Sequence, residues 1–516
     1  MQQSQSKQQV GGILGFIERI GNKIPDITIL FISAFLLVCV VSAVLAQIHF
    51  NYVHPATGRP IEITNMLSGK ALVDLMSKMV TNYANFPPLS MVIVATLGIG
   101  IADGSGYINT GLKKILSITP KVLITPVVIL VGMLSHLGPD SGYVIIIPIA
   151  AYMFYAVGKH PLAGIAASFA GIAGAFAANY TPSAIDPVIQ GFTQSAAQII
   201  DPGYQVNVLC NYFYAFASTF IVIGACWWVT EKITNPWLGK ACPLDDDLDL
   251  GNENNSSITP SENRAFKIAT AVLLLMLTGL AAALYPADSI LRAPDGVIAS
   301  FKAPIMQSIV SLIFIFAALV GLVYGIACGK FKSPKDVTAA MEEITKTLVQ
   351  LIVFYFFAAQ FLYAFGASNM GALIAVSGAE FLKSLNLPPQ VTVFGIIVFV
   401  ALLNLIITSA SAKWAILAPI FVPMLMAVGI APELTQVAFR VSDSAVNVVT
   451  PMFAFYPLII LYCQKYVKNA GIGTLSSMML PYTIALLVSL TFMLYLFWWL
   501  DIPLGFQADY VYPRRF

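Results

Sequence analysis

The sequence predicts an all-α integral membrane protein that contains broken helices and re-entrant hairpins. Three observations support this prediction. Hydrophobic residues make up 58% of the 516 positions and charged residues only 10%, whereas soluble chains carry about 25% charge. Apolar runs long enough to span a bilayer recur along the chain. Several shorter runs come in pairs and are interrupted by Gly, Pro or Ser, as in re-entrant hairpins.

The same composition excludes several other classes of protein. So much apolar surface rules out a soluble or disordered chain, and a net charge of +2 leaves no basic face for nucleic acid. No nucleophile with an adjacent base and no GxxxxGK[ST] loop is present, so we expect no enzyme. The six cysteines show no CxxC spacing and the four histidines form no ligand pair. We therefore expect no cofactor and no structural metal.

Apolar runs place the membrane segments in order along the chain. The pairs of short runs within 122–158 and 389–428 are each joined by a few polar residues, which predicts two re-entrant hairpins. Each hairpin is followed by a predicted broken helix, near 162–187 and near 433–457. The runs are 28–48, 88–105, 122–137, 143–158, 162–180, 210–229, 266–286, 304–328, 346–366, 389–409, 413–428, 433–457 and 476–499.

The chain reads as two related halves, 1–240 and 266–516, joined by a polar linker at 241–265. The stretches PIAAYMFYAVGKHP (148–161) and PIFVPMLMAVGIAP (419–432) share seven of fourteen residues at an offset of 271. Chance similarity between apolar stretches is the alternative, but the matched prolines and the matched order of breaks argue against it. Paired, interrupted segments in two halves, as an inverted repeat, indicate a secondary transporter, because backbone groups freed at membrane depth must line a cavity.

Lysine and arginine predict the orientation. They concentrate in 7–23, 113–121, 231–267 and 330–346. Because positive charge favours the cytoplasmic side, these segments and the N-terminus are expected to be cytoplasmic. The loop at 49–85 is then expected on the opposite side.

Ionisable side chains inside the apolar runs mark the candidate site, since each costs about 2.5–3.5 kcal/mol at the bilayer centre. Arg440, Asp443 and Asn447 lie at i, i+3 and i+7 and share one helical face. Either Arg440 and Asp443 neutralise each other, or Arg440 binds a substrate carboxylate. In the second case Asp443 takes a coupling H⁺ or Na⁺, with oxygens from Asn404 and Asn447. The full set is Asp103, Asp140, Asp186, Lys413, Arg440 and Asp443.

Polar residues near the second hairpin tip extend this candidate site. The hydroxyl of Ser411 either caps a helix or binds substrate. Trp414 is either an interfacial anchor or a platform for an aromatic substrate, and we favour the platform. Lys413 is expected to snorkel to an interface. Asp186 is a helix cap, a proton carrier or a substrate contact.

Two prolines are expected to set the helix breaks around this cluster. Pro432 begins the helix that carries Arg440, and Pro451 ends it.

Several of these stretches resemble the AbgT family of p-aminobenzoyl-glutamate transporters, which includes the MtrF-type antimetabolite efflux proteins. The resemblance covers nearly the whole chain and is most specific over 409–424, SASAKWAILAPIFVPM. It also includes 440–444 (RVSDS), 158–164 (GKHPLAG) and the Asp186-Pro187 pair.

The resemblance implies about nine transmembrane helices plus two re-entrant hairpins, in a homodimer of the bacterial inner membrane. It implies ion-coupled transport of p-aminobenzoyl-glutamate and related aromatic folate-pathway compounds. The alternative is proton-motive-force-driven efflux of sulfonamide-type antimetabolites, and a distant alternative is an ion channel. The direction of transport and the choice of H⁺ or Na⁺ stay open. The family's substrate residues would fall on Asp186, Ser411, Trp414, Pro432, Arg440, Asp443 and Pro451, and its cation site, for Na⁺, on Asn404, Asp443 and Asn447.

Overall fold

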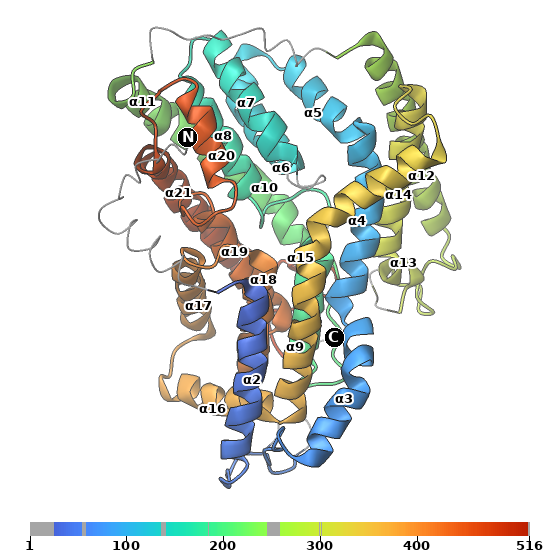
Figure 1. Ribbon diagram of the computed structural model, residues 1–516, viewed down its shortest axis with the longest axis vertical. Helices are drawn as coiled ribbons and strands as arrows, with labels where there is room; N and C mark the ends of the chain where they lie inside the picture. The colour runs from blue at the N-terminus through green and yellow to red at the C-terminus, as the bar shows by residue number, and fades with distance from the viewer. Residues whose placement is uncertain are drawn as a thin grey trace, which may run out of the picture.

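The computed structural model describes residues 25–53, 58–135, 141–183, 185–244, 258–298, 300 and 302–513. Its helices form an elongated bundle (Figure 1). Within the described residues, the only β-type pairings are two isolated bridges, Val53 with Pro60 and Ile430 with Val511. The predicted all-α class is confirmed.

The helices before the central linker include short as well as long segments. A π-helical turn, η3, continues α10 directly into α11. In order they are α2 (Ile27–Leu45), α3 (Gly69–Ala84), α4 (Pro87–Ser105), α5 (Tyr107–Ser117), the 3₁₀ turn η1 (Lys121–Leu123), α6 (Ile124–Leu134), α7 (Ser141–Ala156), α8 (Pro161–Ala173), α9 (Ile185–Ala197), α10 (Tyr212–Val229), η3 (Thr230–Thr234) and α11 (Asn235–Ala241).

The helices after the linker show the same mixture of lengths. They are α12 (Pro260–Leu284), α13 (Pro304–Gln307), α14 (Ile309–Ala327), α15 (Pro334–Ala367), α16 (Met370–Ser384), α17 (Pro389–Asn404), α18 (Ala410–Met426), α19 (Pro432–Val446), α20 (Tyr456–Gln464) and α21 (Ile472–Trp499).

Length and hydropathy identify the helices that can cross a bilayer. Among the described residues, seven continuous helical segments qualify. The bent pair α16–α17, which turns by 117°, adds an eighth if it is counted as one broken span. The seven are Ile27–Leu45, Gly69–Ser105, Tyr212–Ala241, Pro260–Leu284, Ile309–Ala327, Pro334–Ala367 and Ile472–Trp499.

The segments predicted as hairpins and broken helices are shorter. α6 and α7 occupy the range predicted for the first hairpin, and α17 and α18 occupy that of the second. The first hairpin tip, 136–140 with Asp140, and the linker residues 245–257 lie outside the described residues. The sequence did not predict α3, α5 and α16, because they carry more polar residues than a membrane span.

Helix boundaries recur at the offset found in the sequence. α8 begins at Pro161 and α19 at Pro432, 271 residues later, and α9 and α20 begin at Ile185 and Tyr456 with the same spacing. α6 packs on α8 as α17 packs on α19. The repeat therefore extends from the fourteen-residue match to a unit of four helices, α6–α9 and α17–α20.

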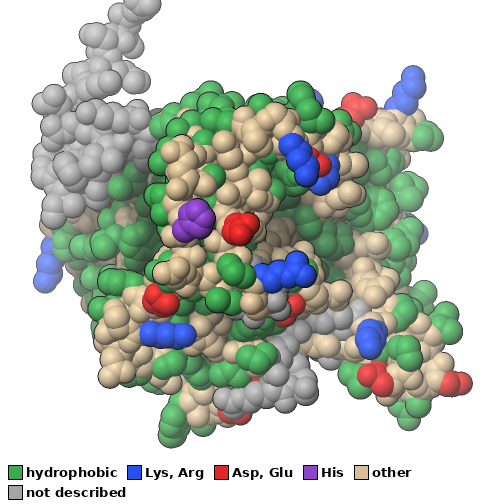
Figure 2. Space-filling view, turned by 90° about the horizontal axis from the view of Figure 1, so that it is seen from below, with side chains coloured by type: hydrophobic (Ala, Val, Ile, Leu, Met, Phe, Trp, Pro, Cys, Tyr) green, Lys and Arg blue, Asp and Glu red, His purple; other side chains and the backbone are tan. Residues whose placement is uncertain are grey.

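Central helices of both units lie in the core of the molecule, since α8 and α19 are buried along their whole length. Every residue of α19 is buried, and α19 contacts α17, α18, α9 and α21. The charges of α19 are therefore held away from solvent. On the end of the molecule seen from below, Lys and Arg side chains lie apart from one another rather than in one patch (Figure 2).

Candidate functional site

One buried ion pair joins α19 to the start of α9. Arg440 Nη1 lies 2.7 Å from Asp186 Oδ1, and Arg440 Nη2 donates to the carbonyl oxygen of Phe176 at 3.1 Å. The second carboxylate oxygen of Asp186 accepts from the backbone N (2.7 Å) and hydroxyl (3.0 Å) of Ser183. The two acceptors of Arg440 therefore come from the break between α8 and α9 and from the first turn of α9.

A second buried ion pair joins α18 to α19. Lys413 Nζ lies 2.6 Å from Asp443 Oδ1, and the two side chains are 0% and 3% exposed. No hydrogen bond with good angles reaches that carboxylate oxygen from the described residues, so the attraction is ionic rather than directional. Lys413 also contacts Asn404 Oδ1 at the end of α17.

One alternative and one expectation about these charges do not agree with the structure. Arg440 and Asp443 do not pair with each other, although they lie one turn apart on α19, because each reaches a different neighbouring helix. Lys413 does not snorkel to an interface, since its side chain is fully buried against Asp443. The two pairs together carry no net charge, which lowers the cost of burying four ionisable groups.

The amides predicted as cation ligands bind each other. Asn404 Nδ2 donates to the backbone oxygen of Asp443 at 2.8 Å and to Asn447 Oδ1 at 3.1 Å. The structure thus brings Asn404, Asp443 and Asn447 together as predicted, with Lys413 as a fourth member that sequence reasoning placed elsewhere.

Trp414 lies in the core beside these pairs. Its ring stacks on Phe439 with centroids 4.5 Å apart, and its Nε1 donates to Thr193 Oγ1 at 2.8 Å. The side chain is 1% exposed, so the indole is closed to solvent in this structure. Ser411, one turn earlier, is also buried.

Sequence reasoning missed a polar network that continues from Trp414. Thr193 donates to Gln436 Oε1 at 2.6 Å, and Gln436 Nε2 donates to Asn211 Oδ1 at 2.7 Å. Asn211 donates in turn to the backbone oxygen of Glu433, whose carboxylate accepts from Tyr204. Glu433 is 0% exposed. The available signal was an ionisable residue directly after Pro432, inside a predicted membrane segment.

Two of the remaining predicted residues lie near the two ends of α19 in the sequence, and the third lies on α4. Pro432 is the first residue of α19, and Pro451 lies between α19 and α20. Asp103, on α4, is not a member of either ion pair.

The Arg440–Asp186 pair lines a small closed cavity. Its volume is about 10 Å³, which is close to the space needed for one water molecule. The cavity is also lined by Asn179, Thr181 and Asn211. We call this conformation occluded at Arg440, because the cavity has no room for more than about one water molecule.

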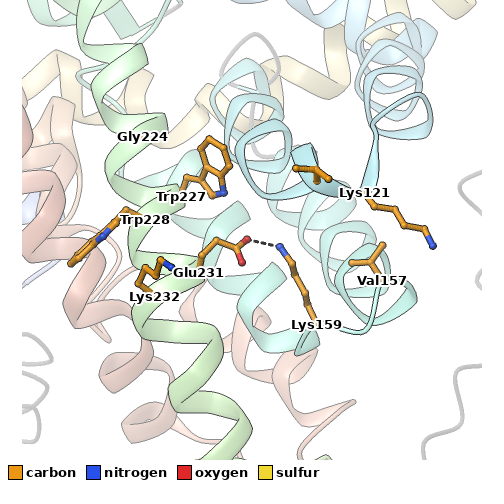
Figure 3. Close-up of a pocket in the computed structure, with 9 residues that line it drawn as sticks. Lys121, Val157, Lys159, Gly224, Trp227, Trp228, Glu231 and Lys232 are labelled. Carbon is orange, nitrogen blue, oxygen red and sulfur yellow. Dashed lines mark hydrogen bonds and ion pairs between the residues drawn. The ribbon is translucent and has the colours of Figure 1, made fainter.

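A larger hollow of about 650 Å³ lies between α10, η3 and the turn after α7 (Figure 3). Trp227 and Trp228 from α10 line it, and Glu231 from η3 points toward Lys159 and pairs with it. None of its lining residues belongs to the predicted site, and the Lys159–Glu231 pair neutralises part of its basic charge.

A bundle of apolar helices with charge pairs buried beside broken helices is the arrangement of a membrane transporter. Comparison with known families agrees. The family described as "AbgT putative transporter family" matches residues 12–512. The chain belongs to the AbgT transporter family, which confirms the resemblance found in the sequence.

Individual relatives match over nearly their whole length. The p-aminobenzoyl-glutamate transport protein of Escherichia coli (strain K12) is 33% identical over 509 residues, covering 99% of this chain and 98% of that protein. The crystal structure of the Alcanivorax borkumensis YdaH transporter, described as having an unusual topology, matches with a TM-score of 0.87 and 37% identity, over 93% of this chain and 100% of that one. Neisseria gonorrhoeae MtrF, from a class of antimetabolite efflux pumps, matches with a TM-score of 0.90 and 39% identity, over 96% and 100%.

Proposed function

We propose that this transporter moves p-aminobenzoyl-glutamate and related aromatic folate-pathway compounds, coupled to a gradient of H⁺ or Na⁺. The observation that carries the proposal is the buried guanidinium of Arg440, held by a carboxylate from the opposite repeat unit. The similarity to the Escherichia coli p-aminobenzoyl-glutamate transport protein supports the choice of substrate.

Arg440 has the chemistry to exchange one carboxylate for another. A guanidinium binds carboxylates through a planar fork of N–H donors. In the occluded state Asp186 and Phe176 occupy that fork. A substrate carboxylate that replaces Asp186 leaves the Asp186 carboxylate with its two hydrogen bonds from Ser183. The exchange therefore frees the start of α9 from Arg440, while the Asp186 carboxylate keeps its hydrogen bonds from Ser183.

The aromatic part of the substrate has a platform close by. Trp414 follows Lys413 on α18 and contacts Thr193 of α9, so the same separation of α9 that frees Arg440 also uncovers the indole. Offset stacking on an aromatic ring contributes about 0.5–1.5 kcal/mol beyond burial. Ser411 and the prolines Pro432 and Pro451 complete the proposed binding region.

The setting of the transporter is part of the proposal. The apolar spans embed the chain in a membrane, which we propose is the bacterial inner membrane, with a cytoplasmic N-terminus and a homodimeric assembly. The concentration of Lys and Arg in 113–121, 231–267 and 330–346 supports the orientation.

Efflux of sulfonamide-type antimetabolites, driven by the proton motive force, is a second candidate function. The 39% identity to MtrF, one of a class of antimetabolite efflux pumps, favours it. Sulfonamides share an aminobenzene ring with p-aminobenzoyl-glutamate and offer no carboxylate to Arg440. The two candidates therefore differ in their need for the guanidinium.

The test is uptake of labelled p-aminobenzoyl-glutamate into proteoliposomes that contain the purified protein. A pH gradient and a Na⁺ gradient are imposed separately, on wild type, Arg440→Ala and the control Lys346→Ala. Lys346 pairs with Glu343 on the exposed face of α15. We expect uptake that follows one gradient, is lost in Arg440→Ala and persists in the control.

Movement of a labelled sulfonamide, with no transport of p-aminobenzoyl-glutamate under either gradient, would overturn the first candidate in favour of the second. Arg440 would then act only as the structural partner of Asp186. Substrate-independent single-channel currents would overturn both candidates in favour of a channel.

A further inference from the structure

The position predicted for a coupling cation contains the ammonium group of Lys413. Its Nζ lies 2.6 Å from Asp443 Oδ1, contacts Asn404 Oδ1 and lies 5.7 Å from the ring centroid of Phe439. A carboxylate, an amide oxygen and an aromatic face are each favourable neighbours of a cation. Lys413 is 0% exposed, so these neighbours replace water around its charge.

The oxygens around Lys413 do not fit a Na⁺ ion. The side-chain oxygen of Asn404 faces the ammonium group, and that of Asn447 accepts from the Asn404 amide at 3.1 Å. A Na⁺ ion bound to Asp443 and Asn404 would therefore lie against the ammonium group, and two positive charges at contact repel strongly in a protein interior. The predicted cation ligands are present, but the ammonium group of Lys413 already faces the side-chain oxygens of Asp443 and Asn404, and the Asn404 amide satisfies that of Asn447.

Helix architecture alone does not explain a lysine at this position. Lys413 lies in the first turn of α18, where the helix dipole disfavours positive charge. In the first repeat unit, at the offset of 271, the positions equivalent to Lys413 and its partners Asp443 and Asn404 hold Gly142, Ile172 and Met133. All three are buried. The repeated helices thus pack without this polar group, so the lysine and its partners belong to the second unit alone.

We propose that Lys413 is the cation of this site and that the transporter neither binds Na⁺ there nor needs it. The inference deepens the proposed function, because it concerns the coupling ion, but it is testable on the purified protein without any substrate. It makes Lys413 a residue that determines ion specificity.

The test compares thermal unfolding of the detergent-purified protein in NaCl and in KCl at equal ionic strength. Wild type is expected to unfold at the same temperature in both salts. Lys413→Ala removes the ammonium and leaves space among the oxygens. Its unfolding temperature is expected to be lower in KCl and to rise with added NaCl in a saturable way, as for a ligand that binds only the folded state.

Two control variants separate ion binding from repacking. Lys413→Met removes the charge but fills the space, so NaCl is expected to give no recovery. The double variant Lys413→Ala/Asp443→Asn lacks the carboxylate, and NaCl is again expected to give none. A structural role for Lys413 would lower the unfolding temperature in all three variants without any difference between the salts, and that result would overturn the proposal.

The wild-type measurement tests the proposal even if the variants do not fold. A saturable, NaCl-specific rise in the wild-type unfolding temperature, absent in KCl, would overturn the proposal directly. So would uptake into wild-type proteoliposomes that follows an imposed Na⁺ gradient. Uptake that ignores the Na⁺ gradient supports it. Loss of all uptake would count against the proposed function, and the unfolding temperatures would still report on Lys413.

Discussion

At the scale of single residues, the sequence identified the buried charges but not their partners. Arg440, Asp443 and Asp186 stand out because ionisable groups are rare in apolar runs. Their pairing followed no local rule, since Arg440 reaches Asp186 across 254 residues of chain and Lys413 reaches Asp443 from the next helix. Helical periodicity shows which side chains share a face of one helix, and it contains no information about the helix opposite.

Glu433 is a buried charge that the sequence does not reveal. Its place next to Pro432 is typical of a helix start near an interface, where an acid in the first turn is favoured by the dipole. In the structure Glu433 is completely buried, and its carboxylate accepts a hydrogen bond from the hydroxyl of Tyr204. Only the packing of α19 against its neighbours makes that burial necessary.

The first prediction concerns the shape of the Arg440 guanidinium. Arg440→Lys keeps the positive charge, but a compact ammonium cannot hold Asp186 and the Phe176 carbonyl in the geometry of a planar fork. Hydrogen bonds to charged groups contribute about 1.5–3 kcal/mol, so we expect p-aminobenzoyl-glutamate uptake to fall roughly ten- to hundredfold. Uptake by Lys346→Arg, a matched change at an exposed ion pair, should equal that of wild type. Wild-type uptake by Arg440→Lys would show that charge alone suffices.

At the scale of helices, turn chemistry was more predictable than tertiary contacts. Both repeat units contain an AVG sequence shortly before a proline, and Gly158 and Gly429 adopt φ of 78° and 87°, a left-handed conformation that suits glycine. Proline follows as the first residue of α8 and of α19. The exact helix ends, and helices as polar as α3 and α5, depend on packing that a hydropathy pattern does not contain.

The turn before α8 also contains a histidine, a residue whose ordinary pKa lies near neutral pH. His160, outside the membrane spans, is the N-cap of α8. Its Nδ1 accepts from the backbone N of Leu162 at 3.2 Å and its Nε2 lies 2.8 Å from the carbonyl oxygen of Cys242. Both contacts together require the neutral ring with hydrogen on Nε2. Burial lowers the pKa of His160, while the Cys242 carbonyl opposes that effect in part.

The second prediction is an acid-sensitive contribution of His160 to stability. Because the pKa is lower in the folded state, the unfolded chain binds more protons. The contribution is then complete above the ordinary pKa of about 6.5 and lost as pH falls through the folded value. Protonation also removes the N-cap, worth about 1 kcal/mol.

The measurement is thermal unfolding of wild type and His160→Asn between pH 8 and 5. Asparagine caps a helix without titrating, so the variant should lose less stability on acidification than wild type. The neighbouring Lys159–Glu231 pair is present in both proteins, so its contribution is common to the two curves. His49→Asn, at an exposed histidine, should follow the wild-type curve. Parallel curves for wild type and His160→Asn would contradict the prediction.

At the scale of the whole molecule, the two repeat units share helix boundaries but differ in charge. α8 and α19, and likewise α9 and α20, begin at matched positions, while Phe169 and Ile172 of α8 stand where α19 has Arg440 and Asp443. The first turn of α9 in the first unit supplies Asp186, and α19 of the second unit supplies the guanidinium that pairs with it. The ion pair therefore crosses between the two units.

The last prediction concerns how this molecule lies in the membrane. α11, from the Lys-rich region 231–267, and α16 lie at opposite ends of the bundle (Figure 1). Positive charge favours the cytoplasmic side, so Lys240 of α11 should face the cytoplasm and Ser384 of α16 the periplasm; both are exposed. In a background with the partly exposed Cys242 and Cys328 changed to Ala, a membrane-impermeant maleimide should label Ser384→Cys in intact spheroplasts. It should label Lys240→Cys only after permeabilisation. The reverse labelling pattern would mean that the molecule has the opposite orientation in the membrane. A substrate would then approach Arg440 from the opposite side.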